Sequence, residues 1–153
     1  MKILTIELLE VAKNNYLKLK SKKEKSTLRQ IMAQIIRKYN SNCPVTFISK
    51  AAQLKAKGIN LFDMNWHEQN KFDKGRLIYH LEHKTTISDI IDLILQGEDV
   101  SDVVNKIEFG WILKEEDKVL NEKGYRSKRL EHNEAYKECG IDIVKASTKC
   151  FYL

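Results

Sequence analysis

The sequence predicts a mostly helical α+β fold in a single domain of 153 residues. Several segments place apolar residues three and four positions apart, as helices with one buried face do. Two short strand-like runs, 77–81 and 108–113, predict a small antiparallel hairpin or sheet. A hydrophobic content of 42% and a single proline, Pro44, are also typical of a folded, helix-rich chain.

Two helices are expected near the N-terminus. From Thr5 to Lys20 the apolar side chains form one stripe, and the segment ends in a run of lysines that extends to Lys25. Ser26 is a good N-cap for a second helix, whose apolar residues recur on one face as far as Tyr39. These elements form the larger part of a helical N-terminal region, 1–70, in the single domain.

A third helix is expected from the N-cap Ser49 to Lys57, with Gly58 in the left-handed C-terminal position. Helix, connection and helix over 26–58 are compatible with a helix-turn-helix that reads DNA through Lys50, Gln53 and Lys55. A simple helical hairpin explains the same pattern. Residues 59–70 are expected to be irregular.

The central region, 71–129, alternates strands and helices. The turn signal Asp73-Lys74-Gly75 precedes the first strand. Thr86 is an N-cap for a helix that ends at Gly97, and a shorter helix is expected over 99–106. After the second strand, a helix over 114–123 begins with three acidic residues and stops at Gly124. The remaining region, 130–153, contains a short helix over 133–139 and an unassigned tail, 141–153.

Composition narrows the function classes. No apolar run is long enough to span a bilayer and no signal-peptide pattern opens the chain, so we expect a cytoplasmic protein with no membrane partner. Three widely spaced cysteines indicate neither a disulfide framework nor a zinc ribbon. The net charge of +6 is compatible with a nucleic-acid partner.

Potential metal ligands are concentrated at the end of the first strand, where His80, Glu82 and His83 lie within four residues. Neutral imidazole and carboxylate are common metal ligands, and a histidine can also take a proton from water. If the two strands pair antiparallel and the following helix packs across them, the first turn of that helix, 115–117, lies close to Glu82. An ordinary strand with satisfied histidines explains the same residues without a metal.

The segments Tyr79-His80-Leu81-Glu82-His83-Lys84-Thr85-Thr86 and Phe109-Gly110-Trp111-Ile112-Leu113-Lys114-Glu115-Glu116-Asp117 carry a resemblance to a known superfamily. Over about residues 71–129 the chain resembles the HNH, or ββα-metal, nucleases. In that superfamily an acidic residue beside a histidine ends the first strand, and a further ligand lies on the following helix. The chain departs from this pattern in its long helical insertion and in having no obvious counterpart of the usual asparagine.

The resemblance implies a role for each matching residue. Glu82 would be a metal ligand and a catalytic residue, His83 the general base, and Glu116 the helix-borne ligand, for which Glu115 or Asp117 could substitute. His80 would be a further ligand, since it shares a strand face with Glu82. The ion would be Mg²⁺ or Mn²⁺, with Zn²⁺ or Ni²⁺ also compatible with these ligands.

The expected function is therefore that of a metal-dependent DNA endonuclease, a hydrolase of phosphodiester bonds from a restriction system or a mobile element. Four cationic residues are the candidates for phosphate contacts: Arg76, Arg126, Lys128 and Arg129. A homodimer is plausible, because cutting both strands symmetrically usually needs two sites. The alternatives are a non-catalytic DNA-binding regulator that uses the 26–58 helix-turn-helix, and a module that binds an acidic protein.

Overall fold

The computed structural model describes residues 1–126 and 132–146. The α-helices are α1 (Lys2–Lys18), α2 (Lys22–Asn40), α3 (Lys50–Lys55), α4 (Gln69–Phe72), α5 (Ile87–Gln96), α6 (Val100–Asn105), α7 (Lys114–Glu122) and α8 (His132–Glu138). The strands are β1 (Phe47–Ser49), β2 (Tyr79–His83), β3 (Phe109–Leu113) and β4 (Ile143–Lys145), and two 3₁₀ helices, η1 (Leu61–Asp63) and η2 (Trp66–Glu68), precede α4. The predicted mostly helical α+β class is confirmed.

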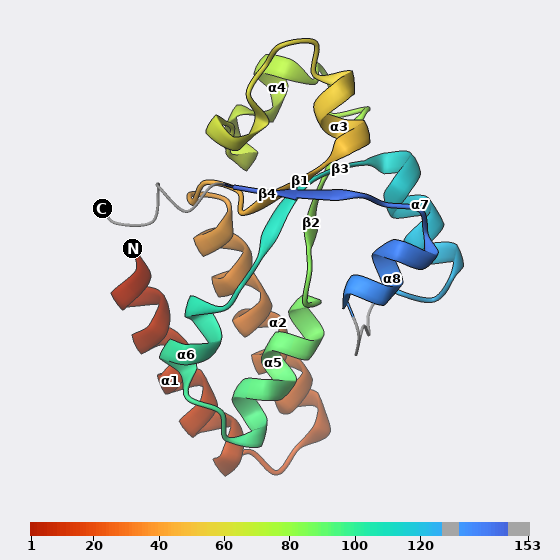
Figure 1. Ribbon diagram of the computed structural model, residues 1–153. Coiled ribbons are helices and arrows are strands. Elements are labelled where there is room, and N and C mark those ends of the chain that lie inside the picture. The colour runs from red at the N-terminus through yellow and green to blue at the C-terminus, as the bar shows by residue number, and fades with distance from the viewer. Residues whose placement is uncertain (127–131, 147–153) are drawn as a thin grey trace.

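The strands form one mixed sheet in the order β2-β3-β1-β4. β2 and β3 are antiparallel, with Tyr79 opposite Leu113 and His83 opposite Phe109, whereas β1 runs parallel to β3 and antiparallel to β4. Figure 1 shows α1, α2, α5 and α6 grouped at one end of the sheet, with α7 and α8 beside it. The chain between β2 and β3 forms α5 and α6, so the two strands are neighbours in space without being a hairpin.

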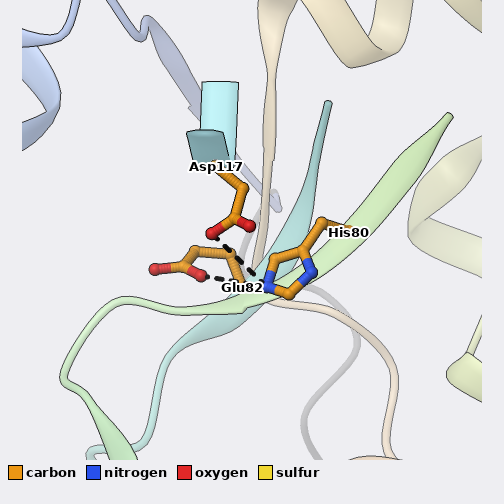
Figure 2. A group of neighbouring side chains, drawn as sticks. All are labelled: His80, Glu82 and Asp117. Carbon is orange, nitrogen blue, oxygen red and sulfur yellow. Dashed lines mark ion pairs between the residues drawn. The ribbon is translucent and has the colours of Figure 1, made fainter. Parts of the chain in front are cut away.

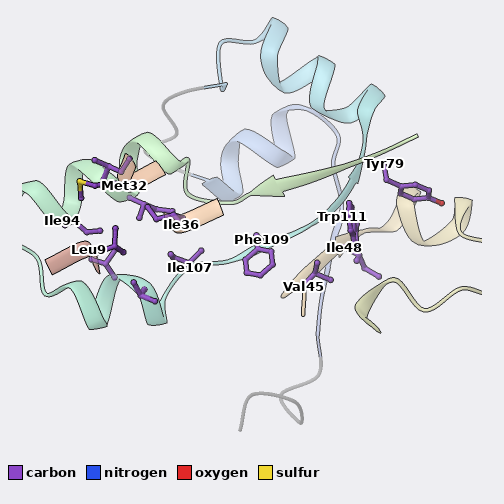
Figure 3. Packing of buried hydrophobic residues seen from close by; sticks show 14 of the residues in the cluster. Leu9, Met32, Ile36, Val45, Ile48, Tyr79, Ile94, Ile107, Phe109 and Trp111 are labelled. Carbon is purple, nitrogen blue, oxygen red and sulfur yellow. The ribbon is translucent and has the colours of Figure 1, made fainter. Parts of the chain in front are cut away.

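Two apolar clusters lie on opposite faces of the sheet. The alternation of side chains along β3 sends Phe109 and Trp111 into the larger cluster and Ile112 into the smaller one. Helices α1, α2, α5 and α6 complete the larger cluster, part of which Figure 3 shows. The smaller cluster adds Leu120 of α7 and Tyr136 of α8. Because β3 is covered on both faces, all five of its residues are buried.

Gly110 lies where β3 passes closest to β1. A Cβ atom at this position would be 1.9 Å from the carbonyl oxygen of Phe47, a backbone atom that cannot rotate away. Gly110 is also the residue opposite Glu82 in the pairing of β2 with β3. The missing side chain therefore allows the three strands to assemble at the level of Glu82.

Several predicted element boundaries need correction. α2 begins at Lys22, with Ser21 as its N-cap, and so Ser26 is inside the helix. Lysine is a good helix former, and the later lysines of the run, Lys22, Lys23 and Lys25, lie in the first turns of α2. β2 begins at Tyr79 because the backbone N–H groups of Leu77 and Ile78 donate to the side chain of Asp73. The unassigned tail contributes β4, and 59–70 contains η1, η2 and the start of α4.

The helix-turn-helix, one of the two interpretations of 26–58, is not formed. Strand β1 separates α2 from α3 and pairs with both β3 and β4. Ser49 does cap α3, as predicted, since its Oγ accepts a hydrogen bond from the backbone N–H of Ala52 at 3.0 Å. α3 is only six residues long, however, and it packs on β1 and β3. The turn 73–75 joins α4 to β2.

Candidate metal centre

The site is built by β2, β3 and α7, which follow the order strand, strand, helix. α7 begins directly after β3 and contacts both strands, so its first turn returns beside β2. Successive side chains of a strand point to opposite faces, and His80 and Glu82 therefore point to the same face. That face is the one that α7 covers, because Ile112, opposite His80, belongs to the cluster that includes Leu120. The first turn of α7 therefore lies beside β2, as the sequence predicted.

Three potential ligands meet where α7 crosses β2. His80 Nε2 lies 3.3 Å from Glu82 Oε2 and 3.8 Å from Asp117 Oδ1 (Figure 2). One ligand atom from each of the three residues lies within 4.8 Å of the others. Glu82 is only 5% exposed, while His80 and Asp117 are partly exposed. One imidazole and two carboxylates are a suitable donor set for a divalent cation that solvent can still reach.

The charges of the cluster favour a positive group at its centre. Burial alone would lower the pKa of His80, but the hydrogen bond with Glu82 and the negative charges of Asp117 and Glu82 outweigh burial and raise it. Two carboxylates this close also repel each other unless a cation lies between them. The arrangement that stabilises an imidazolium would stabilise a divalent cation by the same attraction.

Glu116, the helix residue expected to bind the metal, makes other contacts in the structure. Its Oε2 accepts hydrogen bonds from the backbone N–H of Leu113 at 2.8 Å and from the hydroxyl of Ser49 at 2.6 Å. These bonds close the first turn of α7 and tie it to the start of α3. Asp117, named above as a possible substitute, is the helix residue that lies beside His80, and Glu115 is exposed. The position of Glu116 as third residue of a helix is the usual one for a capping glutamate, a signal the sequence contained.

His83 projects to the other face of β2. Its ring lies against Phe109, with centroids 6.1 Å apart, and its Nε2 is 2.8 Å from Nδ2 of Asn40, the last residue of α2. Asn40 was not expected at the site. Asn121, one turn after Asp117 on α7, was also missed, and its Nδ2 donates to Asp117 Oδ2 at 3.2 Å.

A pocket of about 870 Å³ connects both faces of the edge strand. Glu82, His83 and Asp117 line it together with residues of α2 and η2. Its cationic residues are Arg37 and Lys38 at the end of α2 and Arg126 after α7, all exposed. Of the predicted phosphate contacts, Arg126 therefore faces the site, and Lys128 and Arg129 lie outside the described residues.

Arg76 lies beside the pocket residue Trp66. Its guanidinium carbon is 3.7 Å from the centroid of the Trp66 ring, and its Nη2 donates to the carbonyl oxygen of the same residue at 3.4 Å. Arg76 has a φ of 54°, a conformation that residues with a side chain seldom adopt. Arg76 is not among the described residues that line the pocket.

Comparisons with family models, with curated proteins and with solved structures returned no match. The site is therefore interpreted from its own geometry. Within the described residues, every helix is too short or too polar to cross a membrane.

Proposed function

We propose that the protein is a metal-dependent endonuclease that hydrolyses phosphodiester bonds in DNA. The observation that carries this proposal is the meeting of His80, Glu82 and Asp117 on a strand–strand–helix unit. These residues would hold a Mg²⁺ or Mn²⁺ ion, and Zn²⁺ or Ni²⁺ would fit the same ligands. When bound, such an ion stabilises the charge that develops on a phosphate and on its leaving oxygen.

The cationic residues of the pocket support a phosphate-containing substrate. Arg37, Lys38 and Arg126 line the same pocket as the acidic cluster. The separation of charges is useful for this chemistry, because carboxylates alone would repel a phosphodiester, whereas Lys and Arg at the rim attract it. The pocket reaches both faces of the edge strand β2, and in the proposed function the substrate would lie across that edge.

His83 is the proposed general base. It lines the same pocket as Glu82 from the other face of the edge strand, and in this role its ring would reach a phosphate bound in that pocket. In this role it would take a proton from the attacking water, and the hydroxide would displace the 3′ oxygen. Asn121 would keep Asp117 oriented through the hydrogen bond between their side chains.

The test is cleavage of supercoiled plasmid DNA by the purified chain in Mg²⁺ or Mn²⁺, followed on gels. Glu82→Gln and Asp117→Asn should each lower the cleavage rate by at least about 100-fold, because a neutral amide holds a hard cation poorly. Glu115→Gln is the matched control. It removes an exposed carboxylate two residues from Asp117, outside the cluster, and should cut like the parent protein.

Two results would reject this function. One is an absence of cleavage of DNA by the parent protein with each of Mg²⁺, Mn²⁺, Zn²⁺ and Ni²⁺. The other is normal cleavage by Asp117→Asn. Cleavage of RNA in place of DNA would retain the chemistry and change the substrate, and salt-sensitive DNA binding without cleavage would favour a non-catalytic DNA-binding protein.

A further inference from the structure

Trp66 is a large aromatic residue that lines the pocket and is 37% exposed. It belongs to neither apolar cluster of the described residues, whereas Phe62 and Phe72, on either side of it in the chain, both pack against the larger cluster. The indole is therefore not part of the core. Tryptophan left partly exposed beside a pocket is typical of binding surfaces, because it offers a large apolar area at little cost in conformational entropy.

The backbone that carries Trp66 is fixed by a capping box. Asn65 Oδ1 accepts hydrogen bonds from the backbone N–H groups of His67 at 2.9 Å and Glu68 at 3.3 Å. Glu68 Oε2 in turn accepts a hydrogen bond from the backbone N–H of Asn65 at 3.2 Å. These bonds close η2, so the indole projects from a turn that does not have to be ordered when a ligand binds.

Arg76 holds the indole from one side. Its guanidinium carbon lies over the ring, 3.7 Å from the centroid, and its Nη2 donates to the carbonyl oxygen of Trp66 at 3.4 Å. The backbone N–H of Arg76 donates to the carbonyl oxygen of Asp73 at 2.8 Å, in a turn where Arg76 has a φ of 54°. The turn that leads into β2 therefore also places a cation on the indole, and the pair is stacked before any ligand binds.

The pocket combines this aromatic surface with positive charge. The ring of the neighbouring residue His67 is nearly perpendicular to the indole, at 80°, and so does not stack on it. Three exposed cationic residues line the same pocket: Arg37, Lys38 and Arg126. Tryptophan stacks with flat aromatic groups, and Lys and Arg attract phosphates. A nucleotide whose base is unpaired offers a flat aromatic group and a phosphate in one molecule.

We propose that Trp66 binds an unpaired nucleobase of the substrate by stacking, while the cationic residues of the pocket hold the adjoining phosphates. The nature of the substrate comes from the proposed function, on which this inference rests, and the stacking adds a preference for unpaired bases. Inside a duplex both faces of a base are covered by its neighbours, so a side chain can stack on the base only when it is splayed out. Every base has such a face, and we therefore expect little dependence on base identity.

The direct test is tryptophan fluorescence, because the chain has two tryptophans and only Trp66 is exposed. Trp111 is fully buried, and its Nε1 donates to the carbonyl oxygen of Met64. The full chain is titrated in EDTA, which prevents metal-dependent cleavage, with a single-stranded DNA of about 12 nucleotides. Emission should be quenched in the parent chain and unchanged in Trp66→Phe. An abasic strand with the same number of phosphates should leave the emission of the parent chain nearly unchanged.

The affinity for the same strands, measured by the anisotropy of a dye on the DNA, is the second readout. Trp66→Leu should weaken binding of the ordinary strand by about 10-fold or more and leave binding of the abasic strand as in the parent chain. Trp66→Phe keeps a ring that can stack and should recover most of the affinity. Leu54→Ala is the matched control, since it removes an exposed apolar side chain that is not among the described pocket residues. It should bind both strands like the parent chain.

The inference would be overturned if the ordinary strand did not quench Trp66, or if the abasic strand quenched it equally. Unchanged affinity of a folded Trp66→Leu variant for the ordinary strand would overturn it too. The comparison of the two strands on the parent chain keeps the inference decidable if the leucine variant does not fold.

Binding without metal also separates this inference from the proposed function. Base-dependent quenching by a parent chain that cleaves no DNA would reject the nuclease and retain the nucleobase site. Cleavage of plasmid by a parent chain that shows no quenching would retain the nuclease and reject the nucleobase site.

Discussion

Two buried carboxylates lie near the two ends of β2, and their surroundings differ. Asp73, before the strand, is 2% exposed, and Glu82, near its end, is 5% exposed. The carboxylate of Asp73 accepts hydrogen bonds of 2.9 to 3.1 Å from the backbone N–H groups of Leu77, Ile78 and Tyr79. The carboxylate of Glu82 lies beside the imidazole of His80, with Asp117 next to it.

The comparison shows that the degree of burial does not distinguish a structural carboxylate from a candidate metal ligand. The groups that surround each carboxylate do distinguish them. The carboxylate of Asp73 accepts hydrogen bonds from backbone N–H groups and so stabilises the turn between α4 and β2. The side chain of Gln69 donates a further hydrogen bond to it at 3.0 Å. Glu82 has neighbours that are themselves candidate metal ligands. We therefore expect substitution of Asp73 to act mainly on stability and substitution of Glu82 mainly on metal binding.

The largest expected effect is on stability at Asp73. Asp73→Ala leaves three backbone donors, that of Tyr79 buried and those of Leu77 and Ile78 partly buried, without their acceptor and should lower the free energy of unfolding by about 3 to 5 kcal/mol. Glu82→Gln should lower the free energy of unfolding by clearly less, and it should abolish Mn²⁺ binding. Urea unfolding and calorimetric titration of both variants check this. Equal losses of stability would remove the distinction between the two ends of β2.

Two adjacent residues of α7 provide a finer test of the same distinction. Glu116→Gln weakens the bonds to Leu113 and Ser49 and should cost about 1 kcal/mol of stability while Mn²⁺ affinity stays the same. Asp117→Asn should lower Mn²⁺ affinity by about 10- to 100-fold with little change in stability. Thermal unfolding and metal titration separate the two outcomes. A loss of metal affinity in Glu116→Gln would restore Glu116 as the ligand.

The smallest effect concerns pH. Burial would raise the pKa of Asp73, but the hydrogen bonds from Tyr79, Gln69, Ile78 and Leu77 outweigh burial and lower it. A carboxyl whose pKa is lower in the folded than in the unfolded state adds stability above the unfolded value, and this is lost as pH falls through the folded value. As pH falls below the usual pKa of an aspartate, the parent chain should lose the stability that the ionised Asp73 contributes. Urea unfolding should show a flatter dependence for Asp73→Asn.

Much of the fold was predictable because its signals are local. Thr86 caps α5, Ser49 caps α3, and Gly97 and Gly124 both have positive φ where helices end. The shared face of His80 and Glu82 follows from the two-residue period of a strand. These features need no knowledge of distant residues.

Other features depend on details that a pattern does not contain. Each residue along a helix turns the side chain by about 100°, so the first residue of α7 decides which of three consecutive acids points to β2. Asn40 comes from an element that ends 43 residues before His83, and no spacing links the two. β4 is a short edge strand of only three residues, which is too little pattern to recognise.

The place of β2 at the margin of the sheet has a consequence for solubility. An outermost strand exposes backbone groups that another chain can pair with, and proteins discourage this by placing charged side chains there. β2 holds His80, Glu82 and His83 within five residues. The ionisable side chains proposed for the site therefore also discourage another chain from pairing with this edge strand. If they were replaced by apolar residues, we expect that the edge strand would pair with other chains and that the protein would aggregate.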